Sequence, residues 1–494
     1  MDNFQKKIDI KPEANFALDH ETRRRLGYQL IDRINSYFDS LSDRPVQLAA
    51  GKRSFGQLTD SMPDVGANAA SVLDDISTEL IDKGFHVPAA NYFGLMNPTP
   101  TYIAVLAEAL VAALNPQLAS LARSQLASKI EAETVRWIGE RVGWNNPFDG
   151  TFTSGGNEAN FSGLAMALTS QFPSAVEEGV ASIGAHPVLY ASAESHHSLD
   201  KSVGLLGLGR RALRRIPVNS MMQLDLGALD RAITEDLAMG YKPFAIVGTA
   251  GSTNSGAVDD LVGLGEIAQR HNLWFHVDGA YGAAAILSDQ HRDVVRGIEL
   301  SDSITIDPHK WLAMPFAAGI ILTRHPASLQ ETFGISTPYM PKVAGAAMID
   351  NFKVSAQWSR RMNSLKVWLT LKIHGRNAYE ELINRQLRLA RSFANWVRSS
   401  DQFELTLNPQ LTIVNFRLKD RSLSEAELTA AHLRLVEEIT ADGQRWISST
   451  MAGGRSVLRM MVISYLTEER HLLALQNALI AAAQKIQQPH STSA

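Results

Sequence analysis

Apolar residues in the first 143 positions repeat with the period of a helix. One set near the N-terminus recurs every three or four positions, at Leu26, Leu30, Ile34, Phe38 and Leu41. Charged residues lie between them, so the pattern predicts an amphipathic helix that packs on the protein's own core or wraps around a second subunit. Residues 43–66 are rich in Pro, Gly and Ser and predict a loop. A second helical pattern, over 101–143, is broken at Asn115-Pro116.

Short apolar runs alternate with helical stretches through the middle of the chain. The predicted strands are Pro187–Ala191, Ala245–Thr249, Leu273–Val277, Ser303–Ile306 and Ala318–Leu322. Between the second and the third of them, residues Asp259–His271 have their apolar side chains on one helical face. Strands that are almost continuously apolar and alternate with helices are typical of a mostly parallel sheet with helices on both faces. We therefore predict an α/β large domain.

The pattern changes after residue 366. A long helix at Asn377–Ser399 precedes two strands, Leu411–Leu418 and Val457–Tyr465, and a helix near the C-terminus, which together predict a smaller α+β domain. The predicted division is an N-terminal helical segment over 1–87, a large domain over 88–366, a small domain over 367–486 and a disordered tail over 487–494.

Composition narrows the possible functions. The chain has 494 residues, a formal net charge of −4 and 20% charged residues, which is typical of a soluble globular protein and argues against a nucleic-acid or anionic-membrane partner. The absence of cysteine excludes thiol catalysis, disulfides and cysteine-ligated metals. The histidines lack the spacing of a metal site, so we predict no metal. No apolar stretch reaches the ~18 residues of a membrane span. The N-terminus lacks a signal-peptide core, so we expect a cytoplasmic enzyme.

Polar residues follow four of the predicted strands. These segments are Glu194-Ser195-His196-His197-Ser198, Ala250-Gly251-Ser252-Thr253, Asp278-Gly279-Ala280-Tyr281 and Asp307-Pro308-His309-Lys310-Trp311. Ligands of open α/β sheets bind beyond the carboxyl ends of the strands. The sequence therefore predicts a site at this edge of the sheet.

Three features of this edge suit one cofactor. The glycine-containing segment Thr153–Asn160 precedes a helix-like run, and backbone N–H groups at a helix start bind phosphate, although a tight turn explains the same glycines. Lys310 is able to form an imine, and Asp278 is able to hold a pyridine nitrogen protonated. Together the three predict pyridoxal 5'-phosphate (PLP) as the cofactor.

Five motifs occur in the order seen in a known family. S-G-G-N-E-A-N, H-H-S, G-S-T, H-V-D-G-A-Y and D-P-H-K-W make the chain similar to the PLP-dependent group II amino-acid decarboxylases. That family includes aromatic-L-amino-acid, glutamate and 2,4-diaminobutyrate decarboxylases, and the resemblance runs from about Phe93 to about Trp368. It implies PLP fold type I with a mostly parallel seven-stranded sheet, and a homodimer with active sites near the subunit interface.

The resemblance also implies roles for individual residues. Lys310 resembles the lysine that binds the cofactor aldehyde, and Asp278 resembles the partner of the pyridine nitrogen. His197, rather than His196, resembles the histidine that stacks on the ring. The other implied cofactor contacts are Gly156, Asn157, Ser252, Ala280 and His309. Asp307 stands where the aromatic decarboxylases have an asparagine near the phosphate, and an acid is unexpected there.

Further positions concern the substrate. Thr99, in N-Y-F-G-L-M-N-P-T-P, is implied as a substrate-lining residue. Residues 333–352 show no sustained periodicity, and the family has a loop here that closes over the site and carries a tyrosine that protonates Cα. Tyr339 is therefore the predicted general acid, with a surface tyrosine beside two prolines as the alternative. Arg360 and Arg361 are either structural ion pairs or a clamp for the substrate carboxylate.

These features lead to an expected reaction. We expect the chain to decarboxylate an L-amino acid to its amine and CO₂, with a bulky aromatic side chain favoured over an acidic one or 2,4-diaminobutyrate. The same scaffold supports other PLP reactions, such as transamination or aldehyde formation. A non-catalytic PLP-binding protein would share the fold, but the presence of both Lys310 and Asp278 argues against it.

Overall fold

A computed structural model describes residues 16–50, 61–338, 348–420 and 422–487. Its central sheet contains β1 (Asp149–Thr153), β2 (Pro187–Ser192), β3 (Leu213–Ile216), β4 (Lys242–Thr249), β5 (Trp274–Asp278), β6 (Ser303–Ile306) and β7 (Gly319–Thr323). The strand order is β1-β7-β6-β5-β4-β2-β3. The five strands from β3 to β6 in this order run parallel, and β7 is antiparallel to both of its neighbours. The predicted mostly parallel, seven-stranded sheet is confirmed.

The two strands that the hydrophobic pattern did not predict are β1 and β3, at the two edges of the sheet. β1 has the sequence D-G-T-F-T, with Phe152 as its one large apolar residue. β3 has the sequence L-R-R-I, and its two arginines are half-buried. An edge strand is covered less completely than a central one, so it needs fewer apolar residues and gives a weaker pattern.

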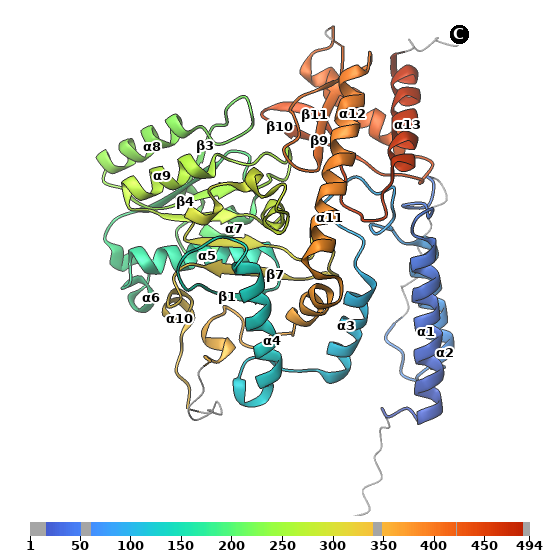
Figure 1. The fold of residues 1–494 in the computed structure, drawn as a ribbon, viewed down its shortest axis with the longest axis horizontal. Coiled ribbons are helices and arrows are strands. Elements are labelled where there is room, and N and C mark those ends of the chain that lie inside the picture. Colours follow the sequence, from blue (N-terminus) through green and yellow to red (C-terminus); the bar gives the residue numbers. More distant parts are fainter. Residues whose placement is uncertain (1–15, 51–60, 339–347, 421, 488–494) are drawn as a thin grey trace, which may run out of the picture.

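Helices cover both faces of the sheet. Those on one face are α8 (Leu226–Ala238) and α9 (Leu261–His271), and those on the other are α5 (Gly156–Gln171), α7 (Ser198–Leu205) and α10 (Ser328–Phe333) (Figure 1). The side chains of β2 alternate between the two layers. Val188 and Tyr190 join the core beneath α8 and α9, whereas Leu189 and Ala191 join the core beneath α5. Both faces are therefore buried, which explains the continuous apolar runs of the central strands.

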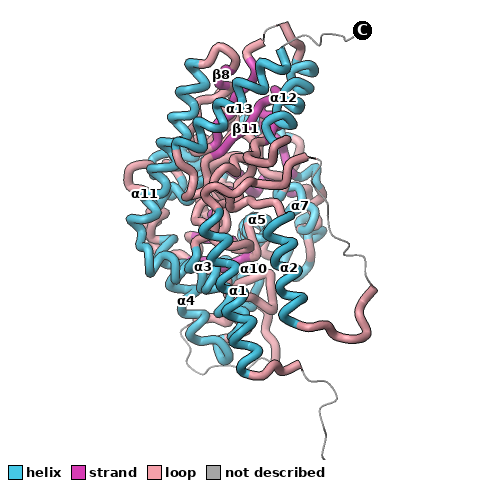
Figure 2. The backbone as a smooth tube through the Cα atoms, turned by 90° about the vertical axis from the view of Figure 1, so that its right-hand side faces the viewer, coloured by secondary structure: helices cyan, strands magenta, loops and turns pink. Residues whose placement is uncertain are grey.

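The N-terminal helices α1 (His20–Ser40) and α2 (Ala69–Lys83) lie side by side on one flank of the molecule (Figure 2). Arg33 of α1 forms an ion pair with Asp74 of α2. Neither helix contains a buried residue. The amphipathic helix predicted near the N-terminus is present, but its apolar face is only partly covered.

The helical region before the sheet is divided as predicted. α3 (Tyr102–Leu114) ends at Asn115, whose φ of +45° is left-handed, and α4 (Leu121–Gly139) follows Pro116. Asparagine tolerates this conformation better than most residues. The Asn-Pro break therefore separates two helices that both pack against α11 (Ser364–Ser399).

The long helix α11 (Ser364–Ser399) connects the central sheet to a second, smaller sheet. Gly375, with φ +73°, bends it, and a left-handed conformation of this kind favours glycine. The predicted domain boundary at residue 366 falls inside this helix. The small sheet has the order β10-β11-β9-β8. The remaining elements are α6 (Ala175–Glu178), β8 (Phe403–Leu405), β9 (Ile413–Leu418), α12 (Glu425–Thr440), β10 (Ser448–Ala452), β11 (Arg455–Met461) and α13 (Glu469–Gln487).

Some predictions fall on other parts of the chain. Tyr339 and all but the first residue of the predicted tail lie outside the described residues. Within the described ranges, no helix combines the length and the apolar character that crossing a membrane requires.

Candidate active site

A cleft of about 470 Å³ lies at the carboxyl ends of the parallel strands. Six residues that the sequence predicts as site residues line it: Gly156, Asn157, Asp278, Ala280, His309 and Lys310. They belong to the start of α5, to the end of β5 and to the segments that follow β5 and β6. The sheet brings these distant segments together because its parallel strands end at the same edge.

Lys310 contributes an amine to this cleft. Its Nζ lies 3.1 Å from Oδ2 of Asp307, and its side chain is 26% exposed, against 2% for Asp307. The lysine follows β6 in the turn D-P-H-K, whose backbone N–H at Lys310 donates to the Asp307 carbonyl. The amine is therefore held in place and is still accessible from the cleft.

Asp278 contributes a buried carboxylate at the end of β5. Its Oδ2 accepts a hydrogen bond of 2.8 Å from Nδ2 of Asn160, and its Oδ1 accepts one of 3.2 Å from the backbone N–H of Ala280. The side chain is 5% exposed. Two donors from different segments therefore fix the orientation of this carboxylate.

A buried polar network in turn fixes Asn160, which lies on α5. Thr305 donates to Oδ1 of Asn160 over 2.7 Å, and Nε2 of His276 lies 3.1 Å from the same oxygen. These contacts identify the oxygen side of the amide, so its NH₂ group faces Asp278. Burial lowers the pKa of His276 to about 4, which leaves its ring neutral near pH 7. The sequence analysis missed Asn160 because only the fold shows that the last Asn of S-G-G-N-E-A-N meets β5.

The start of α5 approaches the segment after β6 closely. A Cβ on Gly156 would lie 2.6 Å from Oδ2 of Asp307, so only glycine fits at the first position of this helix. Backbone N–H groups of the first turn have no partner within a helix and attract anions. Oδ1 of Asp307 and Oγ1 of Thr249 are buried and have no hydrogen-bond partner among the described residues.

These groups fit PLP. The amine of Lys310 suits an aldehyde, the carboxylate of Asp278 suits a protonated pyridine nitrogen, and the start of α5 suits a phosphate. The donor set therefore matches the predicted cofactor at each of its ends.

The side chains of the two adjacent histidines lie in positions that differ from the prediction. His196 lines the cleft, and its pKa is lowered, mainly by burial, with Asp278 and Lys310 close enough to affect it. His197 points away: its side chain is 92% exposed and its Nδ1 lies 3.2 Å from Asp200. The prediction that His197 rather than His196 stacks on the ring is at odds with this geometry. The turn after β2 reverses the direction of successive side chains, and motif register alone did not reveal which one faces inward.

Two other predicted contacts also lie away from the cleft. Thr99 is fully buried, and its Oγ1 donates to the Pro88 carbonyl and lies 2.6 Å from Oγ of Ser464. Ser252 is buried with its Oγ 2.7 Å from that of Ser255. Their neighbours line the cleft instead: Leu95, Met96, Asn97, Thr249, Gly251 and Thr253. Both predicted segments reach the cleft, but in this structure the side chains of Thr99 and Ser252 do not line it.

The two arginines before α11 form ion pairs within the protein. Arg360 is buried and donates over 2.6 Å to Glu131 and over 2.8 Å to the Phe152 carbonyl. Arg361 pairs with Glu108. Of the two predicted alternatives, the geometry favours structural ion pairs over a carboxylate clamp.

The small domain contributes Arg459, which the sequence analysis did not identify. This residue of β11 lines the cleft and is 5% exposed. Its guanidinium donates to the Thr253 carbonyl over 2.6 Å and to Oγ of Ser448 over 3.1 Å. Within the described part of the chain, no carboxylate pairs with it. A charged residue in the otherwise apolar run V-L-R-M-M was the available signal.

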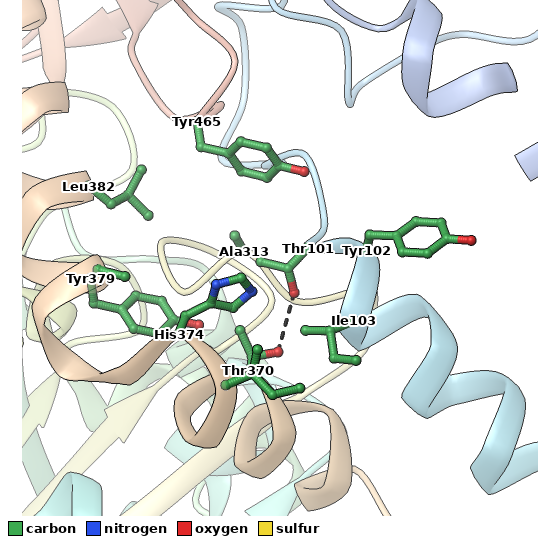
Figure 3. Close-up of a pocket in the computed structure, with 11 residues that line it drawn as sticks. Thr101, Tyr102, Ile103, Ala313, Thr370, His374, Tyr379, Leu382 and Tyr465 are labelled. Carbon is green, nitrogen blue, oxygen red and sulfur yellow. Dashed lines mark hydrogen bonds between the residues drawn. The ribbon is translucent and has the colours of Figure 1, made fainter. Parts of the chain in front are cut away.

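A separate cavity of about 510 Å³ has a lining that shares no residue with the cleft around Lys310 (Figure 3). Ala313 and the side chains of α3 and α11 line it, and Thr101 and Thr370 hydrogen-bond across it over 3.2 Å. Its lining contains no lysine and no carboxylate. This cavity lacks the groups that PLP requires, so the cleft around Lys310 is the candidate active site.

Comparison with known proteins agrees with this assignment. The family described as "Pyridoxal-dependent decarboxylase conserved domain" matches residues 52–419. The aromatic-L-amino-acid decarboxylase of Bacillus atrophaeus is 30% identical over 478 residues, which cover 96% of this chain and 98% of that protein. The 4-hydroxyphenylacetaldehyde synthase of Rhodiola rosea is 27% identical, over 92% of this chain and 94% of that protein.

A solved structure shows the same fold. The crystal structure of Oryza sativa TDC with PLP and tryptamine has a TM-score of 0.89, at 24% identity, and covers 96% of this chain and 100% of that chain. The architecture is therefore PLP fold type I, as the sequence motifs imply.

Proposed function

This chain belongs to the pyridoxal-dependent decarboxylase family, and from that premise we propose that it converts a bulky aromatic L-amino acid to its amine and CO₂. The observation that carries the proposal is that one cleft holds an accessible lysine amine, a fixed carboxylate and a helix N-terminus. Each of these groups suits a different end of PLP, as the family requires.

Different residues of the cleft would bind different parts of the cofactor. Lys310 would bind the aldehyde carbon through Nζ, Asp278 would face the pyridine nitrogen, and Gly156 and Asn157 would offer backbone N–H groups to the phosphate. Bound PLP supplies a ring that accepts the electron pair released when a bond to the substrate Cα breaks. The negative charge of Asp278, held by Asn160 and Ala280, favours the protonated ring nitrogen that makes the ring a good acceptor. The cleft walls would select the bond that breaks by orienting the substrate.

The walls of the cleft favour a large apolar side chain. Leu95, Met96, Phe316, Ile413 and Met461 line it. Burial of an aromatic ring against such side chains is favourable in proportion to the apolar area removed from water. The similarity to a protein named aromatic-L-amino-acid decarboxylase supports the same choice.

Arg459 favours a second candidate, an acidic amino acid. Its guanidinium lines the cleft, is almost fully buried and has no carboxylate partner among the described residues. A carboxylate on the substrate side chain would pair with it. 2,4-Diaminobutyrate, whose side chain is cationic, would instead be repelled.

A panel of L-amino acids tests the proposal. The holoenzyme would be assayed for CO₂, amine, aldehyde and peroxide with phenylalanine, tyrosine, tryptophan, glutamate, aspartate and 2,4-diaminobutyrate. We expect the highest kcat/KM for an aromatic substrate, with amine as the product. Highest activity with glutamate or aspartate, lost in Arg459→Met, would establish the acidic alternative. Aldehyde and peroxide as the main products would assign the aldehyde-forming reaction named for the Rhodiola protein.

The proposal includes a homodimer. α1 and α2 contain no buried residue, and Tyr28, Val72 and Leu80 are 60%, 51% and 65% exposed. A second copy of the chain would cover this apolar flank, with the active sites near the shared surface. A mass of one chain, 54.1 kDa, by light scattering would contradict it. The proposed location is the cytoplasm, which suits a chain without cysteine; cell fractionation tests this.

The histidine assignment leads to a paired prediction. We propose that His196 stacks on the cofactor ring, because it lines the cleft whereas His197 is 92% exposed. His196→Ala should weaken PLP binding by up to about tenfold, the effect of losing a ring contact worth about 0.5–1.5 kcal/mol, and should lower turnover. His197→Ala is the matched control and should change neither. Greater damage in His197→Ala, measured by cofactor retention after dialysis, would restore the original assignment.

Tyr339 remains the proposed proton donor to Cα. A phenol stays protonated at neutral pH and suits a general acid that a closing loop delivers. Tyr339→Phe should keep PLP and release CO₂, but Cα then stays open to O₂. With O₂ and water consumed, the product should shift from amine to aldehyde, ammonia and hydrogen peroxide. An unchanged rate with amine as sole product would mean that another group, such as His196 or a bound water, supplies the proton.

A further inference from the structure

The phosphate end of the cleft contains a carboxyl group that the proposed function does not use. The side chain of Asp307 is 2% exposed, and its Oδ2 lies 3.1 Å from Nζ of Lys310. Its Oδ1 is buried without a hydrogen-bond partner among the described residues. A Cβ on Gly156 would lie 2.6 Å from Oδ2. The carboxyl group therefore lies against the first residue of α5, where the helix N-terminus favours an anion.

A phosphate at the same helix start would meet this carboxylate. A phosphate monoester carries close to two negative charges at neutral pH, since its second pKa is about 6. Two anions that share a buried site repel each other strongly, and such pairs retain one proton between them. Lys310 offsets the charge of Asp307 here, but the proposed function assigns the lysine amine to the cofactor aldehyde. Even while the amine stays free and charged, one lysine charge does not offset the carboxylate and a phosphate dianion together.

We propose that Asp307 takes up one proton from solvent when a phosphate group binds at the N-terminus of α5. The neutral carboxyl group then donates a hydrogen bond to a phosphate oxygen, as the amide NH₂ of an asparagine would. Asp307 gains only this proton, and its other covalent bonds do not change. The inference rests on the proposed function, which places the phosphate at this helix.

The surroundings of Asp307 determine the direction of the pH dependence. The titratable groups that face it are Lys310 and His309 on its own segment, Asp278 at the end of β5 and His196 after β2. Burial raises the pKa of Asp307, and Lys310 and His309 partly oppose this. A phosphate dianion nearby also raises the pKa of Asp307, as burial does. The proton is therefore taken up on binding, and phosphate affinity falls as pH rises from the pKa of Asp307 in the free protein to its higher pKa in the complex, by about tenfold per pH unit for one proton.

Calorimetry measures this proton directly. The full chain, stripped of cofactor, would be titrated with pyridoxine 5'-phosphate, which has no aldehyde and so does not react with Lys310. Heats measured in buffers of different ionisation enthalpy give the number of protons taken up. At about pH 8 we expect wild type to take up about one proton more than Asp307→Asn, and the variant to bind about tenfold more tightly. At about pH 6 the two affinities should converge.

Two controls isolate the phosphate. Pyridoxine without the phosphate should give the same proton count in both proteins. In wild type alone, pyridoxine 5'-phosphate should take up about one proton more than pyridoxine, a comparison that does not depend on how the variant folds. Equal proton counts in all these titrations, or weaker binding by Asp307→Asn at every pH, would overturn the inference.

The outcome is distinguishable from failure of the proposed function. Borohydride reduction of wild type with PLP, followed by peptide mapping, shows whether Lys310 carries the cofactor. A labelled Lys310 with equal proton counts would overturn the inference about Asp307 alone. Absence of label on Lys310 would overturn the proposed function and this inference with it.

Discussion

Lys310→Ala is expected to abolish turnover and the covalent attachment of PLP. Among the described residues, Lys310 is the lysine that lines the cleft, and its side chain is 26% exposed. Without its amine the protein has no nucleophile for the cofactor aldehyde and no group to displace the amine product at the end of the cycle. CO₂ release from the preferred substrate should fall to the background rate. The absorbance band of the bound cofactor that borohydride bleaches should also disappear.

Lys201→Ala is the matched control for this variant. Lys201 is an exposed lysine on α7, the helix that follows the two histidines, and it does not line the cleft. Its loss should leave turnover and the bleachable band unchanged. Mass spectrometry of the borohydride-reduced wild type should find the label on Lys310. A label on any other lysine would contradict the assignment.

The central sheet could be predicted because burial on both faces leaves a strong pattern. β6 was predicted with its observed bounds, Ser303–Ile306, and β2 differs by one residue. The prediction failed at β1 and β3, where the edge position permits polar residues such as those of D-G-T-F-T. The start of α11 was also missed. The predicted helix, Asn377–Ser399, begins just after Gly375, whose left-handed backbone bends α11.

The site could be predicted to the level of the segment but not always to the side chain. Residues at strand ends, such as Asp278, have positions that the sheet determines, and the structure brings Asp278 to the cleft. The sheet does not determine the positions of side chains in turns, because a turn reverses the side-chain direction without a periodic signal. The side chains of His197 and Thr99, both predicted as site residues, do not line the cleft.

The residues that support the site could be identified only from the fold. Asn160 reaches Asp278 across 118 positions of sequence, and Arg459 reaches the Thr253 carbonyl across 206. Contacts between segments this far apart leave no local pattern. They depend on how α5 packs on β5 and on how the small domain lies against the end of β4.

The electronic role of Asp278 leads to the last prediction. Asp278→Asn keeps the size of the side chain but removes its negative charge, so the pyridine nitrogen of the cofactor loses the group that favours its protonated form. The ring then accepts the electron pair from Cα less readily, and a buried electrostatic contribution of this kind is typically worth several kcal/mol of barrier. We expect the variant to retain PLP through Lys310 but to lose roughly a hundredfold or more in kcat.

Asp302→Asn provides the control, because it removes a buried carboxylate outside the cleft. Asp302 accepts a 2.7 Å hydrogen bond from the backbone N–H of Phe275 and pairs with Arg324 and His325. Its replacement should lower thermal stability, since an NH₂ group replaces one of the two acceptor oxygens and Arg324 loses its ion pair, while kcat per folded enzyme stays close to wild type. Asp278→Asn should show the opposite result, with cofactor content near wild type by absorbance and a large loss of kcat. A near-wild-type kcat in Asp278→Asn would mean that another group sets the protonation of the ring. Equal losses of kcat in the two variants would reduce the role of Asp278 to stabilising the end of β5.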